Sequence, residues 1–195
     1  AGTRPIMRGV HVYEDFLCGD LSLPPNNDTP EGVVITDDMT DQEYVRAITE
    51  KEGSSCVGCH KNIINPIGFS FDNFDAFGKF RTQERVFQPE ESNLAGQVLT
   101  TKPISTSAEI NLTDRLEGQF ESVVDIAHYL GRSAQANACF TTKLWNFAQK
   151  QEAKLGTDPC AVNSVYAKVS SSESSIIDAF KEIALQPEFM KRTLQ

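Results

Sequence analysis

The sequence has no long apolar run and little positive charge. No segment reaches the roughly 18 consecutive apolar residues of a membrane-spanning helix, so no transmembrane segment is expected in this chain. Lysine and arginine number 18 against 27 aspartate and glutamate residues, a formal net charge of −9. Because nucleic-acid binding needs clustered basic side chains, no nucleic-acid partner is expected. No signal peptide starts at Ala1, so we expect any export signal to have been removed or to lie upstream.

Apolar residues recur at helical spacing in both halves of the 195-residue chain, which is long enough to bury a hydrophobic core. Thr40, with Glu43 three residues later, has the pattern of an N-terminal capping box. The turn-forming residues of Gly19 to Glu31 predict an exposed loop. Between Phe87 and Leu112, Val, Thr, Ile and Ser occur in short alternations such as T-S-A-E-I-N-L, which predict extended structure or a small hairpin. The predicted helices are Pro5 to Leu17, Asp41 to Lys51, Phe120 to Leu130, Ala134 to Lys150, Ala161 to Val169 and Ser174 to Leu185.

Two cysteines and a histidine stand within five residues, Cys56-Val57-Gly58-Cys59-His60. The pattern C-x-x-C-H is typical of c-type haem attachment. Residues three apart share a helix face, so both sulfurs can reach the vinyl groups on one porphyrin edge, and the histidine can ligate the iron. A thioredoxin-like redox pair, a zinc site and a structural disulfide are the alternatives, but a βαβ setting and two further zinc ligands are missing. The pattern therefore predicts covalent haem c, with Cys56 and Cys59 as attachment residues and His60 as the iron ligand.

The group opposite His60 on the iron decides between two kinds of haem protein. A methionine or histidine there makes a six-coordinate electron carrier, whereas an open position admits a small molecule and allows peroxidase-like chemistry. The sequence does not select among the candidates, and the absence of any protein ligand is a further alternative. The candidates are Met7, Met39, Met190, His11 and His128.

An aliphatic and aromatic run follows the motif. Its side chains suit the wall of a haem pocket and an ordinary core equally well, and both interpretations stay open. Asp72 and Asp75 lie within it, and we expect Arg81 to form an ion pair with an aspartate that fixes this loop. Contact of Arg81 or Lys79 with a haem propionate is the alternative. The run comprises Ile63, Ile64, Ile67, Phe69, Phe71, Phe74 and Phe77.

Three cysteines lie outside the motif: Cys18, Cys139 and Cys160. Covalent haem is attached outside the cytoplasm, where pairs of thiols tend to close. We expect Cys139 to pair with Cys160, which would join a helix to the chain returning past it and leave Cys18 buried at the end of the first helix. Pairing of Cys18 with either of the other two is an alternative that the sequence leaves open.

Two stretches of the chain resemble known bacterial domains. The first runs from P-I-M-R-G-V-H-V-Y-E-D-F-L-C through a proline loop to C-V-G-C-H-K-N-I-I-N-P-I-G-F-S-F-D-N-F-D-A-F-G-K-F-R. It resembles the haem-attachment domain of large secreted multi-domain cytochromes, catalogued as domains of unknown function. The tail, D-I-A-H-Y-L-G-R through L-W-N-F-A to I-A-L-Q-P-E-F-M-K-R, resembles the small helical domain that usually follows. The resemblance implies haem at Cys56, Cys59 and His60, export, and a C-terminal module of a longer polypeptide, but no defined activity.

Together these observations predict a mostly α-helical protein. Residues 1–90 would form a cytochrome c-like haem-binding domain, and residues 117–195 a small helical domain. Residues 91–116 would connect them through extended structure with a minor β-hairpin.

The predicted function is that of a monohaem c-type cytochrome that transfers electrons in the periplasm or outside the cell. Its partner would be a redox protein, alone or within a larger membrane-associated or secreted complex. Electron transfer is favoured over catalysis. The alternatives are a five-coordinate, peroxidase-like haem enzyme and an interaction module in which haem serves as a structural staple.

Overall fold

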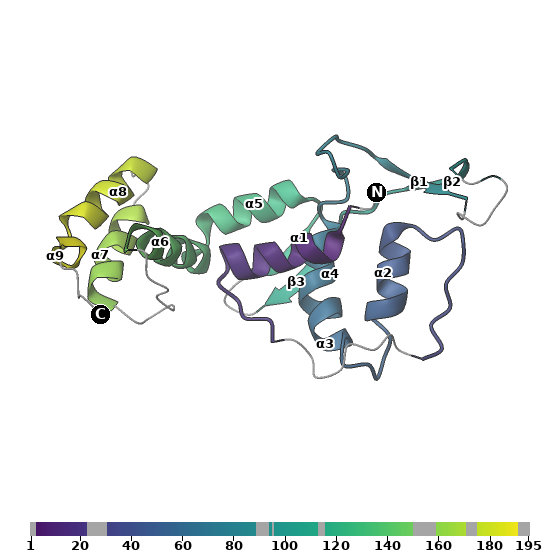
Figure 1. Cartoon of the computed structure of the whole chain (residues 1–195), viewed down its shortest axis with the longest axis horizontal. Coiled ribbons are helices and arrows are strands. Elements are labelled where there is room, and N and C mark those ends of the chain that lie inside the picture. Colours follow the sequence, from purple (N-terminus) through teal and green to yellow (C-terminus); the bar gives the residue numbers. More distant parts are fainter. Residues whose placement is uncertain are drawn as a thin grey trace.

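The protein is mostly helical and carries two small antiparallel sheets (Figure 1). The computed structural model describes residues 3–22, 31–88, 94, 96–112, 116–149, 159–170 and 175–190. Most of the predicted loop from Gly19 to Glu31 lies outside these residues. None of the described helices combines the length and the apolar character needed to cross a membrane.

The first helical segment consists of α1 (Pro5–His11) and a π-helical continuation, η1 (Val12–Phe16). Pro5 is the first residue of α1, a position whose backbone N–H would have no intrahelical acceptor, so proline costs no hydrogen bond there. The segment buries Val12, Tyr13 and Leu17 in the main hydrophobic core. Helical structure over Pro5 to Phe16 agrees with the predicted segment, although the sequence did not indicate that the second half widens to a π-helix.

The next helix, α2 (Asp41–Thr49), begins at the predicted capping box. The Thr40 hydroxyl accepts from the backbone N–H of Glu43, and the Glu43 carboxylate accepts from the backbone N–H of Thr40. A continuous helical stretch follows, made of α3 (Val57–Cys59), η2 (His60–Ile64) and α4 (Asn65–Phe69). It carries the whole C-x-x-C-H motif.

Helix α1 packs against η2 and α4, and Figure 1 shows it crossing α4. Gly9 is buried at the crossing, and a Cβ atom there would collide with the backbone carbonyl of Ile64. Gly68 is its counterpart, because a Cβ there would collide with the carbonyl of Pro5. Each glycine therefore lets the opposite backbone approach, and this contact fixes the helix that carries the motif.

Two hairpin-like sheets replace the single hairpin that we predicted. Strand β1 (Gln83–Phe87) pairs with β2 (Val98–Pro103), and β3 (Ala108–Leu112) pairs with β4 (Leu116–Phe120), both antiparallel. The second sheet buries Ala108, Ile110, Leu116 and Phe120. In the first sheet, β1 alternates exposed and buried residues, but its buried residues are Glu84 and Val86, so the sequence shows no two-residue hydrophobic period there.

The C-terminal helices are α5 (Val123–Arg132), α6 (Ala134–Gln149), α7 (Pro159–Val169), α8 (Ile176–Leu185) and α9 (Pro187–Met190). Trp145, Ala161, Val165 and Ile183 form a small second hydrophobic cluster among α6, α7 and α8. The main cluster instead draws on η1, α4, both strands of the second sheet, α5 and the start of α6. A single core therefore joins the N-terminal helices to the middle of the chain, and the second cluster lies beyond it.

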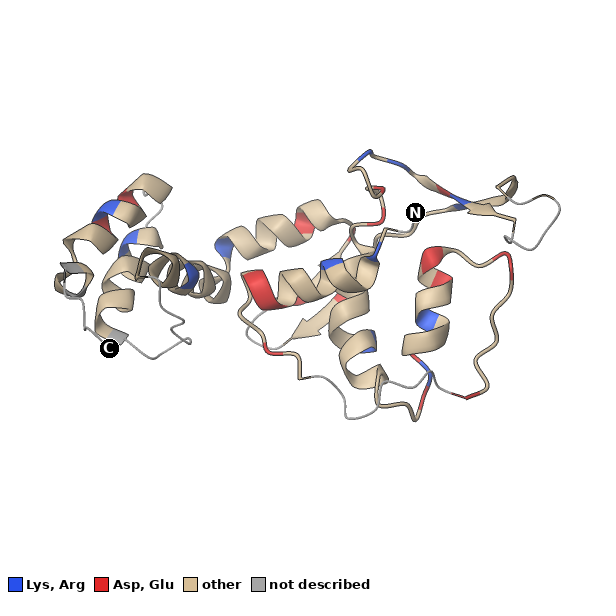
Figure 2. Cartoon of the chain, in the orientation of Figure 1, with Lys and Arg blue, Asp and Glu red and all other residues tan. Residues whose placement is uncertain are grey.

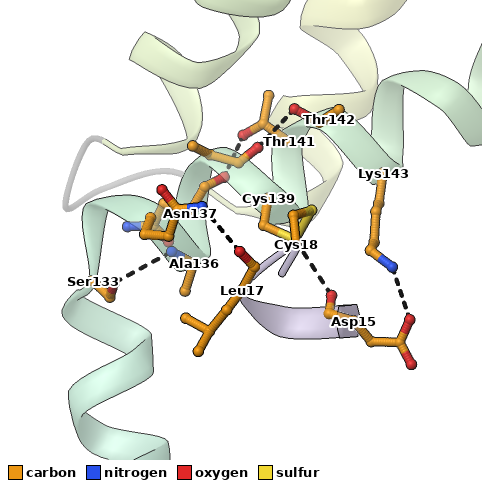
Figure 3. Close-up of a disulfide and its surroundings, with 12 residues drawn as sticks. Asp15, Leu17, Cys18, Ser133, Ala136, Asn137, Cys139, Thr141, Thr142 and Lys143 are labelled. Atoms are coloured by element: carbon orange, nitrogen blue, oxygen red, sulfur yellow. Dashed lines mark hydrogen bonds and ion pairs between the residues drawn. A yellow bond between two sulfur atoms is a disulfide. The ribbon is translucent and has the colours of Figure 1, made fainter. Parts of the chain in front are cut away.

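A disulfide joins Cys18 to Cys139, so the expected pair of Cys139 and Cys160 is wrong (Figure 3). The end of η1 lies against α6, where Gln135 Nε2 donates to the Leu17 carbonyl at 2.9 Å and Lys143 forms an ion pair with Asp15 at 2.8 Å. Cys160 is exposed at the start of α7 and carries a free thiol. Cys160 is closer to Cys139 in the sequence, but the contact between η1 and α6 brings Cys18 next to Cys139 in the fold.

Candidate functional site

The C-x-x-C-H motif lies on a turn of helix at the start of α3. The backbone N–H of His60 donates to the carbonyl of Cys56 at 3.0 Å, which closes the turn that contains both cysteines. Cys56 and Cys59 are half-buried free thiols, and His60 is half-buried as well. The predicted residues therefore stand together on one helical turn, partly open to solvent.

The imidazole of His60 is held by a buried asparagine at the start of α4. Nδ1 of His60 lies 3.1 Å from Oδ1 of Asn65, whose side chain is completely buried. The amide nitrogen of Asn65 donates to the Thr49 hydroxyl at 2.9 Å and to Glu50 Oε1 at 2.8 Å. The histidine of the motif is thus connected to the C-terminal end of α2.

The network continues on the same side of α2. Arg46 pairs with Glu50 at 3.0 Å, and its guanidinium lies over the ring of Phe69, with Cζ 4.6 Å from the ring centroid. This ion pair is partly exposed and contributes little stability by itself. Its effect is positional, because it holds the Glu50 carboxylate where the Asn65 amide needs an acceptor.

The apolar run after the motif divides into core and surface residues. Ile64, Ile67 and Phe69 are buried, and Ile63 and Phe71 pack against the main cluster. Phe77, by contrast, is 93% exposed. Much of the run therefore belongs to the ordinary core, and the question of a haem-pocket wall stays open only for its half-buried and exposed members.

The expected ion pair between Arg81 and an aspartate is not formed among the described residues. Arg81 instead donates through Nε to the backbone carbonyl of Asp72 at 3.1 Å, and its buried Nη2 has no described hydrogen-bond partner. The Asp72 carboxylate accepts from Thr3 Oγ1 and Gln42 Nε2. Burial raises the pKa of Asp72 above its ordinary value, although these hydrogen bonds act in the opposite direction.

Asp75 has a different environment from Asp72. The backbone N–H groups of Lys79 and Phe77 donate to its carboxylate at 2.9 Å, and these hydrogen bonds lower the pKa of Asp75. Beside it, the guanidinium of Arg8 donates to the carbonyls of Phe71, Phe74 and Asp75. The loop that follows α4 is therefore fixed by α1 rather than by an aspartate–arginine pair.

The structure spreads the candidates for a second iron ligand over several surfaces. Met7 is 47% exposed, and Met39 is half-buried before α2. His11 is exposed and lies 3.1 Å from Asp15, and His128 is exposed at the edge of a surface hollow of about 750 Å³. The side chain of Met190 lies outside the described residues. No hydrogen bond or ion pair between described residues joins any of these side chains to His60.

The donors on the motif turn are of the types that haem c takes from a protein chain. No group of three His, Cys, Asp or Glu side chains in the described ranges is arranged to hold a metal ion. A structural zinc ion takes four protein ligands. Haem c needs two thiols and one imidazole from the chain, and this turn offers all three.

Asn65, Thr49 and Glu50 were missed by the sequence analysis, because only the approach of α2 to α4 brings them to His60.

Comparison with protein families gives one partial match. The family model PSCyt3, described as a protein of unknown function (DUF1588), matches residues 1–84. This range contains α1, α2 and the complete C-x-x-C-H turn and ends within β1. No curated protein and no solved structure is found to match the chain.

Proposed function

We propose that this chain is a monohaem c-type cytochrome that carries single electrons outside the cytoplasm. The observation that supports it is the turn of helix on which Cys56 and Cys59 keep free thiols and the His60 ring is held through Nδ1 by Asn65. Haem c, when bound, supplies a one-electron redox centre. Cys56 and Cys59 would hold the porphyrin edge, and His60 would ligate iron through Nε2.

Two further observations support this proposal. The matching family is named PSCyt3, which hints at cytochrome-containing proteins. The Cys18–Cys139 disulfide is compatible with a periplasmic or extracellular location, because such bonds persist mainly in oxidising compartments. A redox partner would meet a protein with a formal net charge of −9, which favours a basic docking surface on that partner.

The test is production of the chain in a host that exports proteins and attaches c-type haem. We expect a coloured protein whose haem stays with the polypeptide on a denaturing gel. Replacement of Cys56 and Cys59 together by serine should abolish this covalent stain. Cys160→Ser is the matched control, since it removes an exposed free thiol far along the chain and should leave the stain unchanged. A colourless wild-type protein with free motif thiols, or with another ion bound to them, would refute the proposal.

Absorption spectra of the same preparation separate an electron carrier from a haem enzyme. A six-coordinate carrier keeps its spectrum when carbon monoxide or cyanide is added, because no iron position is open. Ready ligand binding would instead support the five-coordinate, peroxidase-like alternative.

A further inference from the structure

The orientation of the Asn65 amide follows from its neighbours. The Thr49 hydroxyl donates its proton to the Val45 carbonyl at 2.6 Å, so towards Asn65 it can only accept. Glu50 Oε1 also accepts a hydrogen bond from Asn65. The amide nitrogen must therefore face Thr49 and Glu50, which leaves the amide oxygen facing His60.

This orientation determines which nitrogen of His60 carries the proton. An amide oxygen can only accept, so Nδ1 of His60 must donate. In a neutral imidazole, a proton on Nδ1 leaves the lone pair on Nε2. The Thr49 hydroxyl on α2 thus orients the Asn65 amide, and the amide places the His60 proton on Nδ1. This buried network therefore leaves Nε2 as the atom that can ligate a metal.

The π-helical turn explains how His60 and Asn65 meet. Residues five apart do not share a face in an α-helix, where neighbours on one face are three or four apart. In η2, the backbone N–H of Asn65 donates to the carbonyl of His60, the i to i+5 bond that defines a π turn. The same two residues are therefore joined by a backbone and a side-chain hydrogen bond.

We infer that Asn65 is a positioning residue that fixes the tautomer and ring plane of His60 and adds electron density to it through the Nδ1–H hydrogen bond. The inference rests on the proposed function and extends it to control of the iron. Acceptors for the second nitrogen of a ligating histidine orient the ring and strengthen its donation to the metal. Stronger donation stabilises the oxidised iron and lowers the midpoint potential.

The test uses the haem-loaded full chain and compares a variant that removes the acceptor at Nδ1 with one that keeps it. Asn65→Leu removes the acceptor, and we expect its midpoint potential to shift to a more positive value. The slowly exchanging ring N–H signal of His60 in the reduced protein should be lost as well. Asn65→Asp keeps an oxygen at Nδ1 and should leave the potential unchanged or shift it to a more negative value. Asn62→Ala is the control, since Asn62 is exposed and donates to the Gly58 carbonyl, one turn away in its own helical stretch.

Shifts of the same sign in Asn65→Leu and Asn65→Asp would overturn the inference, because a merely structural role disturbs both variants alike. Equal potentials in Asn65→Leu, Asn62→Ala and the parent would overturn it too. If Asn65→Leu does not fold, Thr49→Val decides, since it removes one of the two acceptors that orient the amide. In Thr49→Val, a positive shift of the midpoint potential, smaller than that expected for Asn65→Leu, supports the inference, and an unchanged potential contradicts it.

A wild-type chain without haem would refute the proposed function but not this inference. The ring nitrogens of the haem-free full chain would then decide by their ¹⁵N chemical shifts. A proton on Nδ1 of His60, lost in Asn65→Leu, supports the positioning role. A proton on Nε2 in the wild-type chain contradicts it.

Discussion

The N-terminal region and the last helices are stabilised by different interactions. Around α1, α2 and α4, buried polar groups such as Asn65, Ser70 and Asp72 are hydrogen-bonded to residues far away in the sequence or to nearby backbone. Among α6, α7 and α8, packing of Trp145 against small and aliphatic residues predominates. Figure 2 shows charged residues on both groups of helices, so the contrast lies in the buried polar groups: buried Thr141 and Thr142 of α6 bond to the backbone of their own helix.

The difference indicates which region holds its side chains in one arrangement. Apolar packing stabilises a fold but tolerates shifts of its members, whereas a satisfied buried polar network allows few alternative arrangements. The motif turn belongs to the region with the network, next to the close crossing at Gly9 and Gly68. The candidate site therefore lies in the part of the chain that fixes side chains most tightly.

Trp145→Ala should give the largest effect, because it empties the centre of the second cluster. Trp145 is 2% exposed, and such a truncation costs about 3–5 kcal/mol of unfolding free energy. Denaturant unfolding followed by circular dichroism measures the loss. Phe147→Ala is the control, since Phe147 is 76% exposed and should change stability by no more than about 0.5 kcal/mol. Equal losses in both variants would contradict this description of the cluster.

Removal of the disulfide tests how the two regions are joined. Cys18 and Cys139 are 121 residues apart, so the bond strongly restricts the unfolded chain. Replacing both by serine should lower the unfolding free energy by about 2–4 kcal/mol. Cys160→Ser should leave it unchanged. A melting temperature that does not respond to the double replacement would show that the contact of η1 with α6 needs no covalent link.

Gly9→Ala should disrupt the N-terminal region through its helix crossing. The added Cβ meets the backbone of Ile64, which cannot turn aside as a flexible side chain would. Overpacking of this kind costs about 1–3 kcal/mol. Gly131→Ala in α5 is the matched control, because no atom lies within 4 Å of its Cβ position and alanine favours helix there. Thermal unfolding of both variants should separate them, and a stable Gly9→Ala would mean that the crossing can widen.

Glu84→Gln should give the smallest effect, visible in the pH dependence of stability. Burial raises the pKa of Glu84 above its ordinary value, while the hydrogen bond from the Asp41 N–H opposes this. The stability linked to this proton is complete below the unfolded-state pKa and is lost as pH rises through the raised folded-state pKa. Glutamine keeps an accepting oxygen for Asp41 and removes this loss.

Urea titrations between about pH 4 and pH 8 would measure the change in slope. The variant should gain unfolding free energy over the parent as pH rises. Glu109→Gln, on an exposed strand position, should keep the parental slope. Identical slopes for Glu84→Gln and the parent would contradict the assigned environment.

Local signals in the sequence predicted much of the helical framework. The capping box at Thr40 and Glu43 is confirmed, and helix α6 starts at the expected Ala134. Features that depend on packing between distant segments were not predictable. The partner of Cys139 was misjudged because the approach of η1 to α6 leaves no local pattern. Strand β2 lies within the predicted extended segment, but β1 was missed, because its buried residues are the polar Glu84 and Val86 and form no apolar alternation.

The candidate site shows the same limit. A five-residue pattern predicts Cys56, Cys59 and His60 as site residues, and the structure places all three on one helical turn. Asn65 stands before Pro66 and looks like an ordinary helix-boundary residue in the sequence. Its contact with Thr49 and Glu50 depends on the approach of α2, and its contact with His60 depends on a π turn that the apolar periodicity does not reveal.

Under the proposed function, the Cys18–Cys139 bond would impose an order on maturation. An exported, haem-binding chain would have to oxidise one pair of thiols while keeping Cys56 and Cys59 reduced until they react with the porphyrin. An oxidant that closes the distant pair would also act on two cysteines that lie three residues apart. Maturation would then have to attach the haem first or reduce the motif again, and the order in which these bonds form would decide whether a folded chain can still receive haem.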